Sequence, residues 1–247
     1  MVTSPSSPQP AALEELLAGA HVEPAVFALR PDYRAMLIAV DGLVPGPCDE
    51  ATDALLRLAE QEALDAVGER SPEELPHVAA WREAYRAFGA KPQRTRNSLE
   101  ALLRRVPAGL PRVNRLTDVY NAVSVRHLLP IGGEDLTRYV GPPRLTRASG
   151  DEGFETTAGG ELVVEHPDPG EVVWGDDVGV TCRRWNWRQT RRTQLGEQTT
   201  TALFILDALD PMSDEALVAA ADDLLGRLAA TTPTLRAARR LLREGGG

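Results

Sequence analysis

Three polar side chains recur at helical spacing in the stretch PRVNRLTDVYNAVSV, where Asn114, Asp118 and Asn121 fall at positions i, i+4 and i+7. This spacing places them on one face of a helix. Amide and carboxylate groups interleaved with apolar residues can line a pocket for a polar ligand. The same pattern also suits a helix cap at Asn114 followed by a solvated face.

A second candidate is LLPIGGEDL, in which Gly132 and Gly133 follow Pro130 and precede Glu134. Paired glycines predict a tight backbone turn where a ligand can approach main-chain N–H groups closely. A plain turn explains the same residues equally well.

The third candidate, CRRWNWRQTRRT, combines two tryptophans with five arginines. In an extended strand, Trp185 and Trp187 share one face and Asn186 takes the other. Tryptophan beside arginine is typical of surfaces that stack bases and grip phosphates. The alternative is an interior strand whose arginines pair with the acidic stretch 148–180 inside the fold.

Most other catalytic chemistry lacks its sequence signature. The chain has no GxSxG elbow, no GxxxxGKS loop and no GxGxxG opening a helix. Cys48 and Cys182 have no neighbouring histidine, and the four histidines form no HExxH or HxxxH pair. We therefore expect no metal and no cofactor.

The elements that must position these residues occur in separate helical and extended blocks. Capping and apolar periodicity predict helices over 49–68, 71–89 (with a break at Pro76), 97–106, 113–129, 213–230 and 232–244. Residues 33–44 predict a buried strand, and short β-rich runs fill 130–209. Because strands and helices do not alternate, we expect an α+β fold with antiparallel-rich sheets and a helical C-terminal tail. Residues 1–12 are expected to be a disordered leader, and residues 13–247 a single domain.

Charge is distributed unevenly along the 247 residues. The net charge is −9, yet residues 91–147 carry a net +7 and residues 181–195 a net +5, almost all from arginine. An acidic protein with local arginine clusters suits a selective nucleic-acid ligand better than non-specific DNA coating. The sequence contains no apolar run long enough to span a membrane and no signal peptide, so we expect a cytoplasmic protein without membrane contact.

The segments WREAYRAFGAKP, SLEALLRRV, LPRVNRLTDVYNAVSV, PIGGEDL, GEVVWGDD and CRRWNWRQTRRT, in this order, resemble the free-standing B3/B4 domain proteins. These are similar to the editing domain of the phenylalanyl-tRNA synthetase β subunit. The resemblance runs from about Pro76 to Leu209. It implies a pocket for the aminoacyl end of tRNA, where a positioned water hydrolyses a mischarged ester, and hence a deacylase that acts in trans.

Carried onto this sequence, the resemblance maps to Asn114, Asp118 and Asn121 and to Pro130 with the glycines after it. We expect Asn121, Gly132 and Gly133 to act in catalysis. We expect Asn114, Ser124, Glu134 and Glu152 to bind the substrate, the two glutamates being candidates for the amino group. The tRNA would contact Arg183, Arg184, Trp185 and Arg188.

The sequence departs from the synthetase pattern at three places. Tyr120 stands where a threonine is expected, Gly132 replaces a histidine, and WNWRQT replaces the glycine-rich segment whose glutamate reads tyrosine. Specificity for tyrosine therefore does not carry over. We expect the chain not to be a complete tRNA ligase. A non-catalytic module that binds tRNA or an amino-acid-like ligand remains the alternative function.

Overall fold

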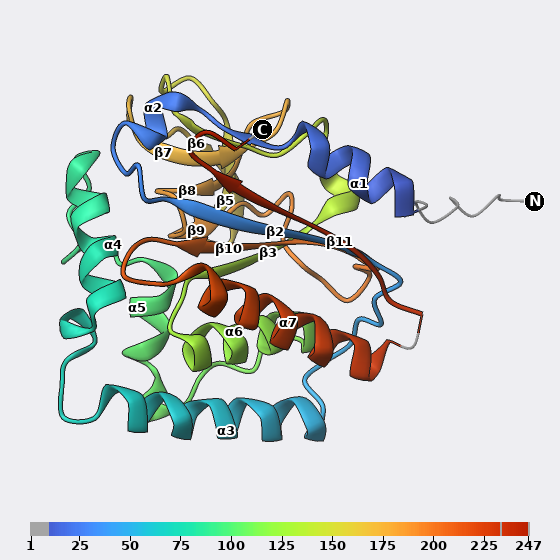
Figure 1. Cartoon of the computed structure of the whole chain (residues 1–247). Helices are drawn as coiled ribbons and strands as arrows, with labels where there is room; N and C mark the ends of the chain where they lie inside the picture. Colours follow the sequence, from blue (N-terminus) through green and yellow to red (C-terminus); the bar gives the residue numbers. More distant parts are fainter. Residues whose placement is uncertain (1–9, 233, 247) are drawn as a thin grey trace, which may run out of the picture.

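The computed structural model describes residues 10–232 and 234–246, and two β-sheets lie at its centre (Figure 1). The helices are α1 (Pro10–Gly19), α2 (Pro24–Phe27), α3 (Glu50–Val67), α4 (Pro76–Ala87), α5 (Ser98–Leu103), α6 (Arg115–His127) and α7 (Asp214–Thr231). The strands are β1 (His21–Val22), β2 (Arg34–Asp41), β3 (Ile131–Asp135), β4 (Arg144–Arg147), β5 (Phe154–Ala158), β6 (Glu161–Glu165), β7 (Val172–Gly175), β8 (Val180–Arg183), β9 (Arg188–Gln189), β10 (Thr201–Ala208) and β11 (Arg236–Arg243).

The larger strands form a four-stranded sheet in the order β11-β2-β10-β3, which is antiparallel throughout. A second sheet has the order β1-β4-β7-β8-β9, and β5 and β6 form a separate hairpin. Segregated helices and antiparallel-rich sheets confirm the predicted α+β class. None of the described helices is long and apolar enough to cross a membrane.

Two cores cover the two faces of the four-stranded sheet. Because side chains alternate along a strand, Leu37 of β2 and Ile205 of β10 face the five-stranded sheet. Ile38 and Phe204, their neighbours in sequence, face α6 and α7. Figure 1 shows the resulting layers, with α7 and α6 below the sheet and α3 beyond α6.

Local capping signals position the helices as predicted. The Asn97 side chain caps α5 by accepting from Glu100 N at 2.9 Å, and Pro76 separates the short 3₁₀ turn η1 (Pro72–Glu74) from α4. The helix predicted over 213–230 is confirmed as α7. Helix α1 begins at Pro10, inside the stretch expected to be a leader, and residues 1–9 lie outside the described part.

The second predicted C-terminal helix is wrong, because residues 236–243 form strand β11. This strand pairs with β2 over eight residues, from Arg236 opposite Asp41 to Arg243 opposite Arg34. Arginine, alanine and leucine favour a helix locally. Here pairing with the edge of β2 that β10 leaves unpaired outweighs that preference, and the segment forms a strand.

Candidate functional site

A cavity of about 250 Å³ opens at the free edge of β3, between the two sheets. Helices α5 and α6 supply its rim, β10 and β3 one wall, and the β8–β9 connection the other. The lining residues that matter below are Ser98, Arg105, Tyr120, Asn121, Gly132, Glu134, Trp174, Cys182, Trp185, Asn186, Trp187, Arg188, Gln189, Ile205 and Asp207.

The outer edge of β3 carries main-chain donors that do not pair with β10, although Gly133 is not among the residues that line the cavity. Asp207 N–H donates to Pro130 O at 3.1 Å, which marks these two residues as a hydrogen-bonded pair. Hydrogen-bonded pairs alternate along an antiparallel ladder. The backbone groups of Gly132 and Glu134 therefore bond to β10, and those of Ile131 and Gly133 point away from it. Consistent with this, Gly133 O accepts from Gln189 Nε2 at 2.9 Å on the outer edge. The N–H groups of Ile131 and Gly133 therefore point away from β10.

The two glycines lie in a strand and not in the tight turn that the sequence predicted. Pairing with β10 imposes the extended backbone. A β-carbon on Gly133 would come within 2.9 Å of Tyr120, Leu195 and Phe204, so close packing excludes a side chain there. A β-carbon on Gly132 would meet only Gln189 Nε2, at 3.1 Å, and Gly132 leaves that part of the cavity open.

Only one of the three polar α6 side chains assigned to the site reaches the cavity. Asn121 is 7% exposed, lines the cavity and forms no hydrogen bond with any described residue. Asn114 instead caps α6 by accepting from Thr117 N at 2.9 Å, and Ser124 donates to Leu129 O at 2.6 Å. Local backbone groups therefore occupy the Asn114 and Ser124 side chains, and neither residue lines the cavity.

The two candidate glutamates lie in different places. Glu134 lines the cavity from β3 and accepts hydrogen bonds from Tyr139 Oη at 2.5 Å and Thr193 Oγ1 at 3.0 Å. Burial raises the pKa of its carboxyl group, while these bonds act in the opposite direction. Glu152 does not line the cavity and instead accepts from the backbone N–H groups of Ser149 and Gly150.

Asp207, a residue that the motifs did not single out, lies at the bottom of the cavity. Its Oδ1 accepts from Tyr33 Oη at 2.6 Å and its Oδ2 from Asn186 Nδ2 at 3.3 Å. Tyr85 Oη donates to Asn186 Oδ1 at 2.9 Å and so fixes the orientation of that amide. Burial raises the pKa of Asp207 to about 7. One sequence signal was available, an aspartate in the otherwise apolar strand TALFILDAL.

The WNW segment is a turn and not a strand face. Arg184 and Trp185 have positive φ angles of 48° and 68°, and residues 184–187 connect β8 to β9. The left-handed backbone carries Trp185 into the core, where it is fully buried against Tyr33 and Trp81. Trp187 stays partly exposed at the cavity and contacts the guanidinium groups of Arg184 and Arg188.

The arginines of this segment mostly pair with the acidic stretch. Arg183 is buried and binds Glu171 at 2.8 Å and Glu165 at 3.1 Å. Arg184 binds Thr95 Oγ1 at 2.9 Å and approaches Glu171 at 3.4 Å. Arg183 and Trp185, to which the sequence analysis assigned tRNA contacts, are thus buried below the molecular surface.

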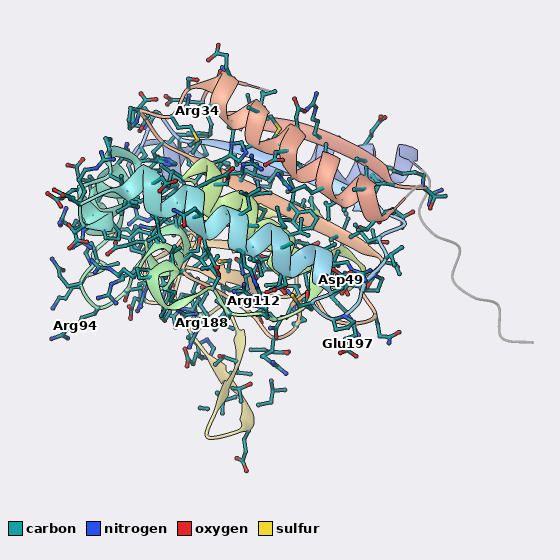
Figure 2. The ribbon with its side chains drawn as sticks, turned by 90° about the horizontal axis from the view of Figure 1, so that it is seen from below. Arg34, Asp49, Arg94, Arg112, Arg188 and Glu197 are labelled. Carbon is teal, nitrogen blue, oxygen red and sulfur yellow. The ribbon has the colours of Figure 1, made fainter. Side chains whose placement is uncertain are left out.

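Arg188 is the residue of this group that reaches both the surface and the cavity. Its side chain is 38% exposed and binds Glu165 at 2.8 Å. Figure 2 shows Arg188 near the base of the β5–β6 hairpin, in agreement with that contact.

Residues 86–105, from the last turn of α4 to two residues past α5, form a separate basic surface. Within the described residues, Arg86, Lys91, Arg94 and Arg105 form neither an ion pair nor a side-chain hydrogen bond and are exposed. The single acid of the segment, Glu100, is buried and already bound by Arg82 and Arg104. Arg94 lies at the periphery of the molecule in Figure 2, whereas Arg105 lines the cavity.

Comparison with known proteins shows a family and similarity to solved structures. The model of the B3/4 domain family matches residues 80–222. No curated protein matches the chain. A solved N-terminal fragment of the phenylalanyl-tRNA synthetase β-subunit from Pyrococcus horikoshii is similar to it, with a TM-score of 0.44 and 13% identity over 90% of this chain and 50% of that chain. The chain thus spans half the length of that fragment.

The family match coincides with the segments whose order suggested the resemblance, and it contains both the basic surface and all the cavity residues named above. Because it covers more than half of the 247 residues, the chain belongs to the B3/4 domain family.

Proposed function

We propose that this protein is an aminoacyl-tRNA hydrolase that acts in trans and removes a wrongly attached amino acid. The observation that carries the proposal is the cavity beside β3, where the Asn121 side chain has no hydrogen-bond partner among the described residues and the Ile131 N–H group points away from β10. Such donors can stabilise the oxyanion of an ester that is being hydrolysed. Family membership and the ordered motif resemblance support the same reaction.

In the proposed reaction a water oxygen attacks the ester carbonyl carbon, and negative charge develops on the carbonyl oxygen. The N–H group of Ile131, with the Asn121 amide, would hold that oxygen. The carbon–oxygen bond to the terminal ribose then breaks, and a proton from the water passes to the ribose oxygen. The products are a free amino acid and an uncharged tRNA.

Water is the proposed nucleophile because the cavity thiol is unsuitable. Burial raises the pKa of Cys182 well above its ordinary value, so the reactive thiolate is absent at neutral pH. No histidine lines the cavity in the described part of the chain.

We assign the tRNA contact to the basic surface 86–105, together with Arg188, in place of the buried arginines. Unpaired cations beside the cavity can hold phosphates while the aminoacyl end enters. The substrate is charged tRNA, which makes the cytoplasm the proposed location and translation quality control the proposed role.

The direct test is to incubate the purified protein with total charged tRNA and measure which amino acids are released. We expect loss of at least one amino acid above the spontaneous rate, unchanged by a chelator. A screen of all canonical charged tRNAs with no such loss would refute the hydrolase.

A non-catalytic binding module is the second candidate, and the Tyr120 and Gly132 replacements favour it. The cavity lacks the threonine hydroxyl and the histidine imidazole that the synthetase pattern places there. A binder would leave the ester intact or lengthen its half-life in the same assay, whereas a hydrolase shortens it.

A further inference from the structure

We propose that the cavity recognises its ligand through a positively charged primary amino group that binds Asp207. If the proposed function is correct, this group is the α-amino group of the esterified amino acid. The inference rests on the proposed function for the identity of the ligand but not for the amino-group subsite.

The first observation is the environment of the Asp207 carboxylate. It is 2% exposed, and both of its hydrogen-bond partners, Tyr33 and Asn186, are neutral donors. No salt bridge between described residues includes it. A buried carboxylate without a cation is costly, and a cationic ligand in the adjoining cavity would relieve that cost.

The other cavity carboxylate is less suited to the same role. Glu134 already accepts from Tyr139 and Thr193, and the positive charge of Arg192 also acts on it. Glu134 pairs with Leu203 on β10, four residues before Asp207. At about 3.4 Å per residue the two backbone positions are roughly 14 Å apart along the strand.

Two further features of the cavity suit an ammonium group. Trp174 and Trp185 line it, and indole rings attract cations. Asn121 lines the same cavity and offers an amide oxygen that no described residue binds, although the side chain is more than nine-tenths buried. An ammonium group has three donors and can therefore bind more than one oxygen acceptor.

The test compares amides of the twenty amino acids, which carry a free α-amino group and no carboxylate, with their N-acetyl derivatives. Binding is measured by calorimetry. We expect at least one amide to bind and its N-acetyl derivative to bind at least tenfold more weakly. Equal binding of both forms, or no binding by any amide, would overturn the proposal. This comparison uses the unaltered protein and needs no variant to fold.

The variant Asp207→Asn then identifies the carboxylate. It should reduce the affinity for the amide to that for the acetylated form, while the exposed control Asp222→Asn changes neither. If Asp207→Asn leaves the preference for the free amine intact, Asp207 is not the amino-group site. An amide that binds through Asp207 in a protein that hydrolyses no charged tRNA would refute the hydrolase and retain the subsite.

Discussion

At the scale of single residues, the Asn121 side chain has no hydrogen-bond partner among the described residues, whereas Asn114 and Ser124 each bond to a backbone group. Asn121→Ala should lower the turnover of the hydrolase by roughly 10²–10³, because one donor aimed at a developing oxyanion is worth about that much. Its melting temperature should change little, since no hydrogen bond is lost. Rate and melting temperature measured on the same preparation check both halves.

Ser124→Ala is the matched control on the same helix. It removes a buried hydrogen bond to Leu129 O and should lower stability by about 1–3 kcal/mol while the rate per folded molecule is unchanged. The reverse pattern, with a stable Asn121→Ala protein of full activity, would place Asn121 outside the reaction.

His77 predicts a pH dependence of stability. Its Nδ1–H donates to Leu128 O at 2.9 Å, and its Nε2 accepts from Trp81 and from Leu209 N. Burial lowers its pKa from 6.5 to about 4. Between these values the unfolded chain binds a proton that the folded chain does not, so stability falls as pH falls, by at most about 1.4 kcal/mol per pH unit.

Urea unfolding at several pH values between 4.5 and 7.5 tests this on wild type and His77→Gln. The wild type should lose more stability than the variant as pH falls. The raised pKa of Asp207 acts in the opposite direction in both proteins, because the folded state then gains a proton below about pH 7. Parallel pH curves for the two proteins would show that His77 does not stay neutral.

The sequence indicated part of the cavity and missed its most buried charge. Asn121, Gly132 and Glu134 line the cavity as the motif spacing suggested. Asn114 and Ser124 satisfy local backbone groups, an outcome that residue type alone does not distinguish from ligand binding. Asp207 went unassigned because its partners Tyr33 and Asn186 come from distant segments that only the fold brings together.

At the scale of elements, prediction succeeded where the signal was local. The caps at Asn97 and Ser213 and the break at Pro76 each depend on residues within four positions. Strand β11 and the turn at Trp185 were predicted wrongly because distant pairing and two left-handed residues decide them. Local propensity does not contain that information.

The two glycines of β3 give a paired prediction. Gly133→Ala should destabilise the protein by about 1–3 kcal/mol, because its β-carbon meets buried Tyr120 and Phe204 at 2.9 Å. Gly132→Ala should cost less, since the flexible Gln189 side chain is its only close neighbour, but it should weaken binding in the cavity. Urea unfolding and a deacylation assay on both variants separate these effects, and equal destabilisation would contradict the packing described.

At the scale of the whole molecule, the chain has a net charge of −9. Residues 86–105 nevertheless form a basic surface that includes cations without an acidic partner among the described residues. Binding of tRNA should therefore weaken with salt. Replacing both Lys91 and Arg94 by alanine should flatten the slope of log affinity against log salt by roughly 1.5 units, at 0.7–0.9 per phosphate contact. Filter binding between 50 and 300 mM salt would measure this slope.

A control variant with the same change in charge replaces Arg239 and Arg243 of β11 by alanine. These two arginines form ion pairs with Asp222 and Asp214 of α7. This variant should keep the wild-type slope. If both double variants flatten the slope equally, overall charge governs binding and residues 86–105 are not the interface.

The position of β2 between β10 and β11 has a consequence for synthesis on the ribosome. Strand β2 leaves the exit tunnel long before its two neighbours, which lie about 160 and 200 residues further along the chain. Seven of its eight residues are buried in the finished sheet, so a nascent chain exposes this apolar strand until β10 and β11 have been made. Such segments are prone to aggregate and to bind chaperones. Ribosome-bound chains that stop before residue 236 should therefore leave one edge of β2 unpaired, and yield in cells should depend strongly on residues 236–243.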